Sequence, residues 1–579
     1  MTELFRNFFS VDDAPRNIEN KVFLVFIFIA AFFRFYNIEF QSPWLDEILT
    51  LYETDPSLNF SELFYRITKK AIHPPVYLTT LHYLYQIFGF SISFTRYFSA
   101  FFSVVCGYFL FRYSHKALGV NSSFPILLLL FVNLSFYWFS IEGRSYVFFI
   151  SLLVISHFIS FRYSDNQSVW NLIGLFFINL LIIYTNYYGV FFIFSQGLIN
   201  IFYYHKNDRR IFKTFFLKYF LLALLFIPWI PFTSEGVNIK GFILEPPVLS
   251  EIWRPAFNSL FPNFLLKCLV LIFYLAGSIV CFRHNRFVFY QLTGWLYGLI
   301  LFPYVFSHLV SPVMGWKYFI FILVPLIVFV GLGLSSVRYF YLRICLYFAL
   351  FGISFYLVFW KFSSNYYPVK AEFKPFMDFI VDTGNDLPVV VNEVTANTYY
   401  NEFNNFNLNL VPFDALLSND SLKSLLMSQG WWELHTHRPF FLASVDKRLS
   451  DSSFYRMDYN NFSTLSLVLP KKLLIFPDNI SFSASGDLVM KFPSVYHTSG
   501  KAQFVFSLKS ELPFYSTNKI RLRLNDQFRS FRLSNRNGIY FANFDLPKDA
   551  FSIIFSDFEK EKPALKKITL VDFMLRKVD

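Results

Sequence analysis

The stretch KVFLVFIFIAAFFRFYNIEFQSPWLDEILT, residues 21–50, decides the fold class of this chain. Its first part is almost entirely apolar, and an apolar run of this length predicts a helix that crosses a membrane. Two adjacent carboxylates, Asp46 and Glu47, follow shortly after the run ends. No small-residue cleavage site follows the run, so we interpret it as a retained span and not as a removed signal peptide.

The composition extends this interpretation to most of the chain. Of the 579 residues, 55% are hydrophobic and 22% are aromatic, which is more apolar material than soluble domains usually carry. The predicted fold class is therefore a polytopic α-helical membrane protein. We predict eleven spans, with boundaries near 21–38, 94–112, 123–140, 146–162, 169–185, 187–204, 215–232, 263–282, 287–306, 317–335 and 341–361.

The formal charge of +12 is unevenly distributed. Residues 362–579 hold 25 Lys and Arg against 23 Asp and Glu, about +2, which leaves about +10 for residues 1–361. With the N-terminus in the cytoplasm, the inside loops hold most of this excess, as the positive-inside rule requires. The cations assigned to these loops are Arg112, Lys116, Arg162, Lys206, Arg209, Arg210, Lys213, Lys218, Arg283, Arg286, Arg338 and Arg343.

An odd number of spans then places the C-terminal domain outside. The predicted location is the plasma (inner) membrane, with the C-terminal domain in the periplasm. The basic excess belongs to membrane loops and not to a basic soluble module, so we predict no nucleic-acid partner. The four cysteines, which we interpret as small buried hydrophobic residues, offer no disulfide framework or zinc-ligand spacing: Cys106, Cys268, Cys281 and Cys345.

The first outer loop, residues 39–93, is predicted to fold as a cap. Its last part, PPVYLTTLHYLYQIFG at residues 74–89, is too short to span the membrane. Two prolines at its start suit the first turn of a helix. We predict an amphipathic helix that lies on the outer surface of the membrane.

The composition changes near residue 362, beyond the predicted transmembrane domain of residues 1–361. Over residues 362–465, strand-like segments such as PVVVN and RPFFLASVD alternate with helical ones such as FKPFMDFIVDTG and DSLKSLLMSQG, which predicts an α/β domain. Residues 466–579 read as short alternating strands between turn residues, which predicts a β-sandwich. Four aromatic residues in the α/β region are either core residues or a sugar-stacking surface: Tyr399, Tyr400, Trp431 and Trp432.

Charged residues gather at the predicted outer ends of the spans. Such residues are costly near hydrocarbon and are usually kept for pairing or for function. Asp46 and Glu47 offer a general base with a neighbouring carboxylate, or two ligands for a divalent cation. The structural alternative is that Asp46 caps a helix that runs through ILTLYE.

Three further candidates precede or join spans. His73, just before two prolines, can contact a phosphate or a substrate hydroxyl, or it can be an ordered interfacial histidine. Glu142 and Arg144, in SIEGRSY, can form an internal ion pair or line a cavity.

The remaining candidates also have structural alternatives. Arg96 can simply extend toward the lipid headgroups. Lys317, in SPVMGWKYF, can neutralise a lipid phosphate or anchor a span end at the interface. Asn186 and Tyr187, in TNYYG, can do no more than cap helices.

Together these pieces resemble the bacterial membrane glycosyltransferases of the GT-C class, and among them the protein O-mannosyltransferases and the lipid A aminoarabinose transferases. The resemblance covers about residues 20–340. It rests on the order of the motifs: a carboxylate pair after the first span, the HPP helix, Arg96 with Ser-Ala, E-x-R-x-Y, TNYYG, and a late span that starts with a basic residue and Tyr.

The resemblance implies a polyprenyl-phosphate-linked sugar donor, a protein, lipid or glycan acceptor, and an active site on the extracytoplasmic side. Asp46 matches the catalytic base of the family, and Glu47 is its neighbour in acceptor or cation binding. The implied substrate-binding residues are His73, Arg96, Glu142, Arg144, Tyr146, Tyr187 and Lys317. Many relatives carry Arg where this chain has Lys317, and Lys binds a phosphate as a point charge without the bidentate geometry of Arg.

Three other functions fit parts of the pattern. A polymerase or ligase of lipid-linked glycans shares many spans and outer charges, but its decisive loops usually come later in the chain. A transporter or flippase commonly shows an internal repeat and ionisable residues at mid-span, whereas here the charges cluster at the outer ends. A structural subunit has no reason to gather acids, a histidine and a lysine on one side.

Overall fold

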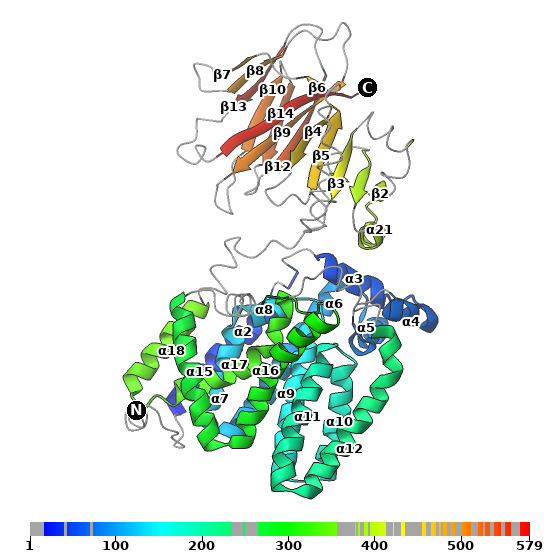
Figure 1. Cartoon of the computed structure of the whole chain (residues 1–579). Coiled ribbons are helices and arrows are strands. Elements are labelled where there is room, and N and C mark those ends of the chain that lie inside the picture. The colour runs from blue at the N-terminus through cyan, green and yellow to red at the C-terminus, as the bar shows by residue number, and fades with distance from the viewer. Residues whose placement is uncertain are drawn as a thin grey trace. The chain divides into compact units, whose positions relative to one another are not determined.

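The structure is a computed structural model of the chain (Figure 1). Contacts divide the chain into two compact units, one of Met1–Gln41 and Leu49–Tyr367, and the other of Ser42–Ile48 and Pro368–Asp579. The structure describes residues 17–36, 38–39, 43–69, 73–233, 247–248, 264–355, 377, 380–381, 387–391, 394–412, 421, 430–434 and the strands between 454 and 578.

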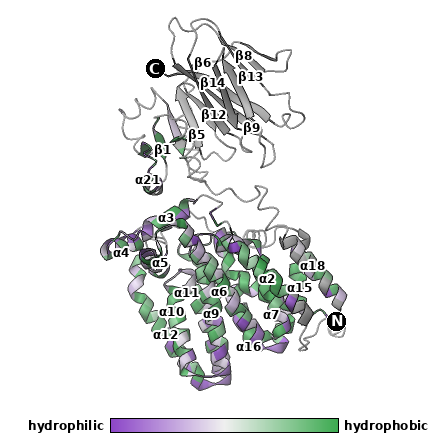
Figure 2. Ribbon diagram, turned by 180° about the vertical axis from the view of Figure 1, so that it is seen from behind, coloured by the Kyte–Doolittle hydropathy of each residue, from purple (hydrophilic) through white to green (hydrophobic). Residues whose placement is uncertain are grey.

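The first unit is a bundle of apolar helices. Figure 2 shows hydrophobic residues along these helices and hydrophilic residues gathered toward their ends. The helices of the bundle are α2 (Asn17–Phe35), α6 (Ile92–Leu118), α7 (Val120–Val132), α8 (Leu134–Ser140), α9 (Tyr146–Asp165), α10 (Val169–Ile183), α11 (Tyr188–Asn207), α12 (Arg209–Phe226), α15 (Phe264–His284), α16 (Arg286–Leu309), α17 (Leu323–Ser335) and α18 (Phe340–Phe355), with the 3₁₀ turns η1 (Ile227–Trp229) and η2 (Trp316–Ile322).

The predicted spans overlap these helices, but the span over residues 123–140 covers both α7 and α8, and residues 356–361 of the last span lie outside the described residues. Within the described residues, six helical stretches are long and apolar enough to cross a membrane, or seven if α7 and α8 form one span. Two shorter apolar helices, Phe23–Phe35 and Val169–Ile183, accompany them. The chain is therefore a multi-pass membrane protein.

The span predicted over residues 123–140 is not one straight helix. α7 and α8 meet at a bend of 65°. Asn133 lies between them in an extended conformation, and its side-chain oxygen accepts a hydrogen bond of 3.0 Å from the backbone N–H of Phe136. The amide caps α8 in the way that favours Asn at helix starts, so a new helix begins where the hydrophobic pattern continues without interruption.

Glycines allow two helices of the bundle to approach closely. A Cβ atom added at Gly277 in α15 would overlap the carbonyl oxygen of Phe329, and one added at Gly333 in α17 would overlap that of Phe273. Small residues at such crossings let helix backbones pack in direct contact inside a membrane. Any larger residue at Gly277 would force α15 and α17 apart.

Neutral polar side chains form a connected set inside the bundle, which we call the amide network. Gln291 in α16 donates a hydrogen bond of 2.6 Å from Nε2 to Oδ1 of Asn200 in α11. All of its members are buried except Tyr219, which is half-buried. The network consists of Ser156, Asn179, Gln196, Asn200, Tyr219 and Gln291.

The remaining bonds of the amide network join four helices. Asn179 in α10 donates to Gln196 in α11 at 2.9 Å, and Gln196 donates to Ser156 in α9 at 3.0 Å. Asn200 donates to the hydroxyl of Tyr219 in α12 at 2.7 Å, and that hydroxyl donates to Gln196 at 3.2 Å. Amide groups are expensive to bury without partners, and here they bond one another across neighbouring helices, with only Oε1 of Gln291 lacking a partner among the network's amide atoms named above.

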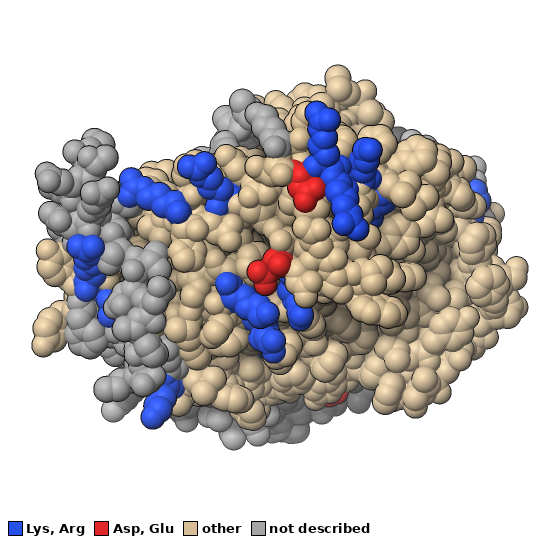
Figure 3. All heavy atoms as spheres, turned by 90° about the horizontal axis from the view of Figure 1, so that it is seen from below, with Lys and Arg blue, Asp and Glu red and all other residues tan. Residues whose placement is uncertain are grey.

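One end of the bundle, which we call the basic end, carries a surplus of cations. Figure 3 shows Lys and Arg outnumbering Asp and Glu on this face. The exposed cations of the loops and helix ends here are Arg112, Lys116, Arg162, Arg209, Arg210, Lys213, Arg283, Arg286 and Arg338.

Two of the cations that the sequence assigned to inside loops lie elsewhere. Lys218 is a buried residue within α12, with its Nζ 3.8 Å from the centre of the Tyr219 ring. Arg343 is buried in α18 and donates to the carbonyl of Val337 at 2.7 Å. The predicted span of residues 215–232 already included Lys218, and α12 starts still earlier, at Arg209, so Lys218 lies inside a helix and not in a loop.

The expectation of four buried cysteines is half correct. Cys106 and Cys281 are buried, but Cys268 and Cys345 are exposed on the outside of the bundle. A hydrophobic pattern cannot separate these cases, because in a membrane protein the lipid-facing side of a helix is as apolar as its packed side.

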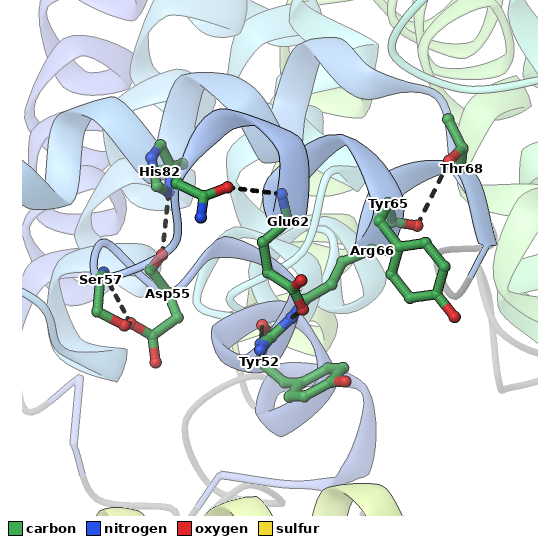
Figure 4. Close-up of polar contacts among 9 residues, drawn as sticks. Tyr52, Asp55, Ser57, Glu62, Tyr65, Arg66, Thr68 and His82 are labelled. Atoms are coloured by element: carbon green, nitrogen blue, oxygen red, sulfur yellow. Dashed lines mark hydrogen bonds and ion pairs between the residues drawn. The ribbon is translucent and has the colours of Figure 1, made fainter.

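Three short helices follow α2: α3 (Leu45–Thr54), α4 (Phe60–Lys69) and α5 (Pro75–Phe88). Figure 4 shows Arg66 of α4 lying between Glu62 and Tyr52. Its guanidinium donates to the Tyr52 carbonyl at 2.6 Å, pairs with Glu62 at 3.3 Å and lies 4.1 Å from the centre of the Tyr52 ring.

The helices α3 and α5 are also connected. The ring of His82 in α5 bonds through Nδ1 to the carbonyl of Asp55 at 3.0 Å, while the Asp55 side chain accepts the backbone N–H of Ser57 at 2.9 Å (Figure 4). The helix α5 has Pro74 as its N-cap and Pro75 at its first position, as the sequence predicts. Segments 43–69 and 73–91, which lie between α2 and α6, are therefore folded.

The second unit contains a mixed sheet and two antiparallel sheets. The mixed sheet has the order β2-β1-β3-β5-β4. β1 runs parallel to β2 and to β3, and β5 runs antiparallel to β3 and to β4. Its elements are β1 (Val389–Val391), α21 (Val394–Phe403), β2 (Leu410–Pro412), β3 (Trp431–Leu434), β4 (Phe454–Asp458) and β5 (Leu465–Pro470).

The two antiparallel sheets have the orders β11-β10-β13-β8-β7 and β12-β9-β14-β6. Sheets in which distant strands pair in this way are typical of sandwiches. Their strands are β6 (Leu474–Ile475), β7 (Asn479–Phe482), β8 (Leu488–Phe492), β9 (Lys501–Ser510), β10 (Lys519–Leu524), β11 (Gln527–Arg532), β12 (Gly538–Asp545), β13 (Phe551–Ser556) and β14 (Ile568–Val578).

The aromatic residues of the α/β region divide between core and surface. Tyr400, Trp431 and Trp432 are at most 2% exposed, so they are core residues and not a sugar-stacking surface. Tyr399 is half-buried and stacks on Phe403. The strand predicted in RPFFLASVD and most of the helices predicted in FKPFMDFIVDTG and DSLKSLLMSQG lie outside the described residues.

Candidate active site at one end of the helix bundle

The two carboxylates of the opening stretch lie in the first turn of α3. The carbonyl of Trp44 accepts the first helical hydrogen bond, from Ile48 at 3.0 Å, so Trp44 is the N-cap of the helix. The alternative that Asp46 caps this helix is therefore wrong. Glu47 is 0% exposed and its Oε2 accepts the Trp44 backbone N–H at 3.4 Å, whereas Asp46 is half-buried. Glu47 completes the helix start, and Asp46 keeps partial access to solvent.

Arg144 joins α3 to the turn between α8 and α9. Its Nη1 donates a hydrogen bond of 2.8 Å to Oγ1 of Thr50. Thr50 follows Asp46 by four residues, so both lie on the same face of α3. Ser99 in α6 donates to the backbone carbonyl of Arg144 at 3.4 Å. The E-x-R-x-Y turn, the α6 start and α3 are thus in contact.

Tyrosine rings bring the late basic segment to the same place. Tyr318, the neighbour of Lys317 in η2, stacks on Tyr188 with ring centres 4.7 Å apart. Tyr318 also meets Tyr146 edge-on at 6.5 Å, and the Tyr188 hydroxyl donates to the carbonyl of Val313 at 3.2 Å. The first residues of α9 and α11 therefore hold the segment that carries the half-buried Lys317.

The HPP motif reaches this end of the bundle through α5. The backbone N–H of Val76 donates to the carbonyl of Tyr184 at 2.9 Å, just before TNYYG. Tyr77 packs between the rings of Phe98 and Phe148 at 6.0 and 5.9 Å. His73 is buried two residues before α5 begins.

The other candidates have different surroundings. Arg96 is buried and its Nη1 donates to the carbonyl of Ile38 at 3.0 Å, so it does not extend to the surface. Glu142 is also buried, and its carbonyl accepts the backbone N–H of Arg144 at 2.8 Å. Tyr187 is the half-buried N-cap residue of α11, and Asn186 accepts the backbone N–H of Tyr188 at 3.1 Å as a helix cap.

Three residues that organise this end were not selected from the sequence. Thr50 and Tyr188 are common residue types, and only the fold reveals that they meet Arg144 and Tyr318. Arg34 had a usable signal, because a cation inside an apolar span is rare. It is fully buried and donates to the carbonyls of Ala30 at 2.6 Å and Phe131 at 2.9 Å, which ties α2 to the end of α7.

Few side chains at this end of the bundle could serve as ligands of a divalent cation. Asp46 and Glu47 are adjacent, but no group of three or more His, Cys, Asp or Glu side chains with metal-site geometry occurs among the described residues. Mg²⁺ and Ca²⁺ require six or more oxygen ligands. Two carboxylates fit such an ion only if water or substrate oxygens supply the rest of its shell.

No protein-family model and no curated protein sequence matches the chain. Among solved structures, ArnT from Cupriavidus metallidurans in its apo state aligns with a TM-score of 0.52 and 11% identity, over 78% of this chain and 98% of ArnT. The same protein bound to undecaprenyl phosphate aligns with a TM-score of 0.51 and 11% identity, over the same shares.

The chain has the GT-C fold. At this identity the likeness concerns the path of the backbone and not individual side chains. The contacts described above bring six segments together at one end of the bundle: α3, the start of α5, the start of α6, residues 140–146, residues 184–189 and η2.

Proposed function

We propose that this chain is an integral membrane glycosyltransferase. It transfers a sugar from a polyprenyl-phosphate donor to a protein, lipid or glycan acceptor of the cell envelope, on the extracytoplasmic face. The observation that carries this proposal is the convergence of Arg144, Thr50, Tyr146, Tyr188 and Tyr318 at one end of the bundle. The GT-C fold supports it, because the similar ArnT has been solved with undecaprenyl phosphate bound.

Asp46 is the proposed catalytic base. It is half-buried and belongs to the helix that Arg144 holds through Thr50. The acceptor hydroxyl or amine attacks the anomeric carbon of the donor and gives its proton to the Asp46 carboxylate. The bond between the anomeric carbon and the phosphate oxygen breaks, and the electron pair leaves with the lipid phosphate. A single displacement of this kind inverts the anomeric configuration.

Lys317 and His73 are the proposed contacts of the lipid phosphate. The leaving phosphate gains negative charge, which a cation stabilises more strongly than it stabilises the intact donor. Lys317 is half-buried beside Tyr318, and His73 is buried two residues before α5 begins. The remaining site residues are proposed to shape this site and to position its substrates: Glu47, Arg96, Glu142, Arg144, Tyr146 and Tyr187.

The proposed orientation places the basic end in the cytoplasm. Nine exposed cations lie at this end, and cytoplasmic loops are the ones that collect Lys and Arg. With eleven spans, the C-terminal domain then lies outside the plasma (inner) membrane, in the periplasm. We propose domains of 1–361 for the transmembrane domain with its folded loop 39–93, 362–470 for the α/β domain, because β5 (Leu465–Pro470) belongs to its mixed sheet, and 471–579 for the β-sandwich.

We also propose a binding site for a divalent cation, at the two adjacent carboxylates of α3. Asp46 and Glu47 would hold it, and it would supply positive charge near the donor phosphate. Glu47 already bonds the N-cap N–H of α3, so one of the two carboxylates serves the helix start. Assays with EDTA, and with Mg²⁺ or Mn²⁺ restored, decide whether a cation is needed.

The test uses the purified full-length protein in detergent with a panel of polyprenyl-phosphate sugars. We expect release of free lipid phosphate with at least one donor, faster when an envelope extract supplies the acceptor. Asp46→Asn should stop this reaction. Glu62→Gln is the matched control, because Glu62 is an exposed carboxylate of the neighbouring α4. If no donor reacts, or if Asp46→Asn reacts normally, the proposal is wrong.

A further inference from the structure

Two uncharged polar side chains are buried without a hydrogen-bond partner at the end of the bundle that holds the candidate site. Asn186 is 0% exposed and Ser145 is 2% exposed. In the part of the chain that the structure describes, neither Nδ2 of Asn186 nor Oγ of Ser145 meets a partner. Buried polar groups nearly always have one, because an unmade bond leaves the cost of desolvation uncompensated. These two groups therefore require an explanation.

A helix cap fixes the direction of the Asn186 side chain. Its Oδ1 accepts the backbone N–H of Tyr188, the first residue of α11, at 3.1 Å. A backbone N–H bonds the oxygen of an amide and not its nitrogen, so this contact also fixes where the NH₂ group lies. The cap thus uses the acceptor of Asn186 and leaves its two N–H donors, held in one orientation, for another group.

Ser145 occupies the N-cap position of α9 without capping the helix. Its backbone is helical, with φ −68° and ψ −5°, and its side chain accepts no hydrogen bond from α9. Ser91 and Ser168 hold the same position in α6 and α10, but their backbones are extended. Their hydroxyl oxygens accept backbone N–H groups at 3.1 and 3.3 Å, as N-cap serines usually do. The conformation of Ser145 withholds its hydroxyl from the helix.

Ring contacts place both side chains at the candidate site. Tyr146, the neighbour of Ser145, and Tyr188, two residues after Asn186, both contact Tyr318, with ring centres 6.5 and 4.7 Å away. The first turn of α5 also touches both segments, through the carbonyl that precedes TNYYG and through a ring of α9. The two groups therefore lie on segments that meet η2 and α5, which carry or follow the proposed contacts of the lipid phosphate.

Their chemistry suits the hydroxyl groups of a sugar better than it suits a phosphate. A phosphate is stabilised most strongly by cations, and Lys317 supplies that charge in the proposed site. Sugar hydroxyls both donate and accept, so an amide N–H and a serine hydroxyl can each bond one. The neighbouring rings of Tyr146 and Tyr188 are buried, and sites for small ligands combine apolar surroundings with a few placed polar groups.

We propose that Asn186 and Ser145 bind hydroxyl groups of the donor sugar and so select which sugar is transferred. Nδ2 of Asn186 donates to one hydroxyl oxygen, and the Ser145 hydroxyl bonds a second. This inference rests on the proposed function, because it names the part of the polyprenyl-phosphate sugar that these groups recognise. A site that bonds a substrate hydroxyl strongly rejects an analogue without it, since the polar groups of the site then stay unpaired.

The test compares binding of the carrier lipid with and without its sugar. Full-length protein in detergent is titrated with undecaprenyl phosphate and with a panel of hexosyl and pentosyl undecaprenyl phosphates. Asn186→Ser keeps an oxygen that can cap α11 but removes the amide donors. Asn285→Ser is the matched control, because Asn285 caps α16 at the basic end by accepting the backbone N–H of Val288 at 3.1 Å.

The second test variant is Ser145→Ala, which removes the hydroxyl alone. Ser160→Ala is its matched control. Ser160 is likewise 1% exposed and has no partner among the described residues, but it lies in the last turns of α9, toward the basic end. Thermal unfolding of all four variants verifies that they are folded.

We expect the wild type to bind at least one sugar-bearing lipid more tightly than undecaprenyl phosphate. Asn186→Ser should weaken binding of that lipid roughly tenfold, and Ser145→Ala about fivefold, since each removes a hydrogen bond to a sugar hydroxyl. Binding of undecaprenyl phosphate should stay within about twofold in both variants, because they leave the phosphate contacts intact. Both controls should behave like the wild type.

Three results would overturn the inference and leave the proposed function standing. The wild type could gain no affinity from any sugar, Asn186→Ser could weaken both kinds of lipid equally, or both test variants could bind the sugar-bearing lipid normally. A different result separates the two proposals: a wild type that binds none of these lipids would contradict the proposed function, and the inference with it.

Discussion

Two regions of the bundle bury polar residues, and they do so with different chemistry. The amide network uses neutral side chains that bond one another across α9, α10, α11, α12 and α16. The candidate active site uses charged ones, among them Glu47, Glu142 and Arg144. A network of neutral groups can satisfy itself and hold helices together. Buried charges are costlier, so their concentration at one end of the bundle indicates a function for that end.

The largest expected effect comes from Asp46→Asn. The substitution keeps the size of the side chain but removes the base, and a positioned general base contributes about 10²–10⁴-fold to a rate. We expect transfer to fall by at least about 100-fold, while expression and thermal unfolding in detergent stay unchanged. A parallel fall in thermal stability would show that Asp46 has a structural role and not a catalytic one.

The second effect tests the connection between Arg144 and Thr50. Arg144→Gln removes the 2.8 Å hydrogen bond that holds α3, so we expect transfer to fall about 10- to 100-fold through misplacement of Asp46. Thr50→Val removes the acceptor alone and should cost less. In a double-mutant cycle the two changes should be strongly non-additive. Additive losses would mean that Arg144 acts without Thr50.

Sequence reasoning located the candidate site better than it located the packing that supports it. The charges at span ends stood out because they interrupt apolar runs, so Asp46, Arg144 and Lys317 were selected without a structure. The supporting contacts were not visible in this way. Thr50 and Tyr188 are ordinary residues whose importance depends on which segments meet, and nothing in the local sequence specifies that.

The prediction of the fold likewise succeeded for long hydrophobic patterns and failed where single side chains decide the structure. Hydrophobic runs predicted the approximate positions of the long apolar helices, because membrane crossing requires a minimum apolar length. They missed the break at Asn133, since its cause is a single side-chain cap inside a continuous apolar run. Lys218 was counted as a loop cation although the predicted span of residues 215–232 contains it, and the structure places it inside α12.

The third effect belongs to the amide network. Asn200→Leu removes the hydrogen bonds to Tyr219 and from Gln291, and we expect the free energy of unfolding to fall by about 1–2 kcal/mol. Unfolding in sodium dodecyl sulfate measures this change. Transfer per folded molecule should stay near the wild-type value. A folded but inactive Asn200→Leu protein would contradict the view that the amide network stabilises the bundle and takes no part in transfer.

The smallest effect concerns the ring of Tyr318. Tyr318→Phe keeps the stacking on Tyr188 at 4.7 Å, so transfer should stay within about twofold. Tyr318→Ala removes the ring that holds η2 against α9 and α11, and about a tenfold loss is expected from the misplaced Lys317. Initial rates at saturating donor separate the two variants. Equal loss in both would assign a chemical role to the Tyr318 hydroxyl.

The two lysines of these regions allow the most direct test of the central claim, which is that a lipid phosphate binds at the charged end. Lys317→Met and Lys218→Met make the same change in the candidate site and beside the amide network. Binding of undecaprenyl phosphate to each purified protein is the measurement. The account predicts that Lys317→Met weakens binding about tenfold and that Lys218→Met leaves it unchanged. Weakened binding in Lys218→Met with full binding in Lys317→Met would contradict it.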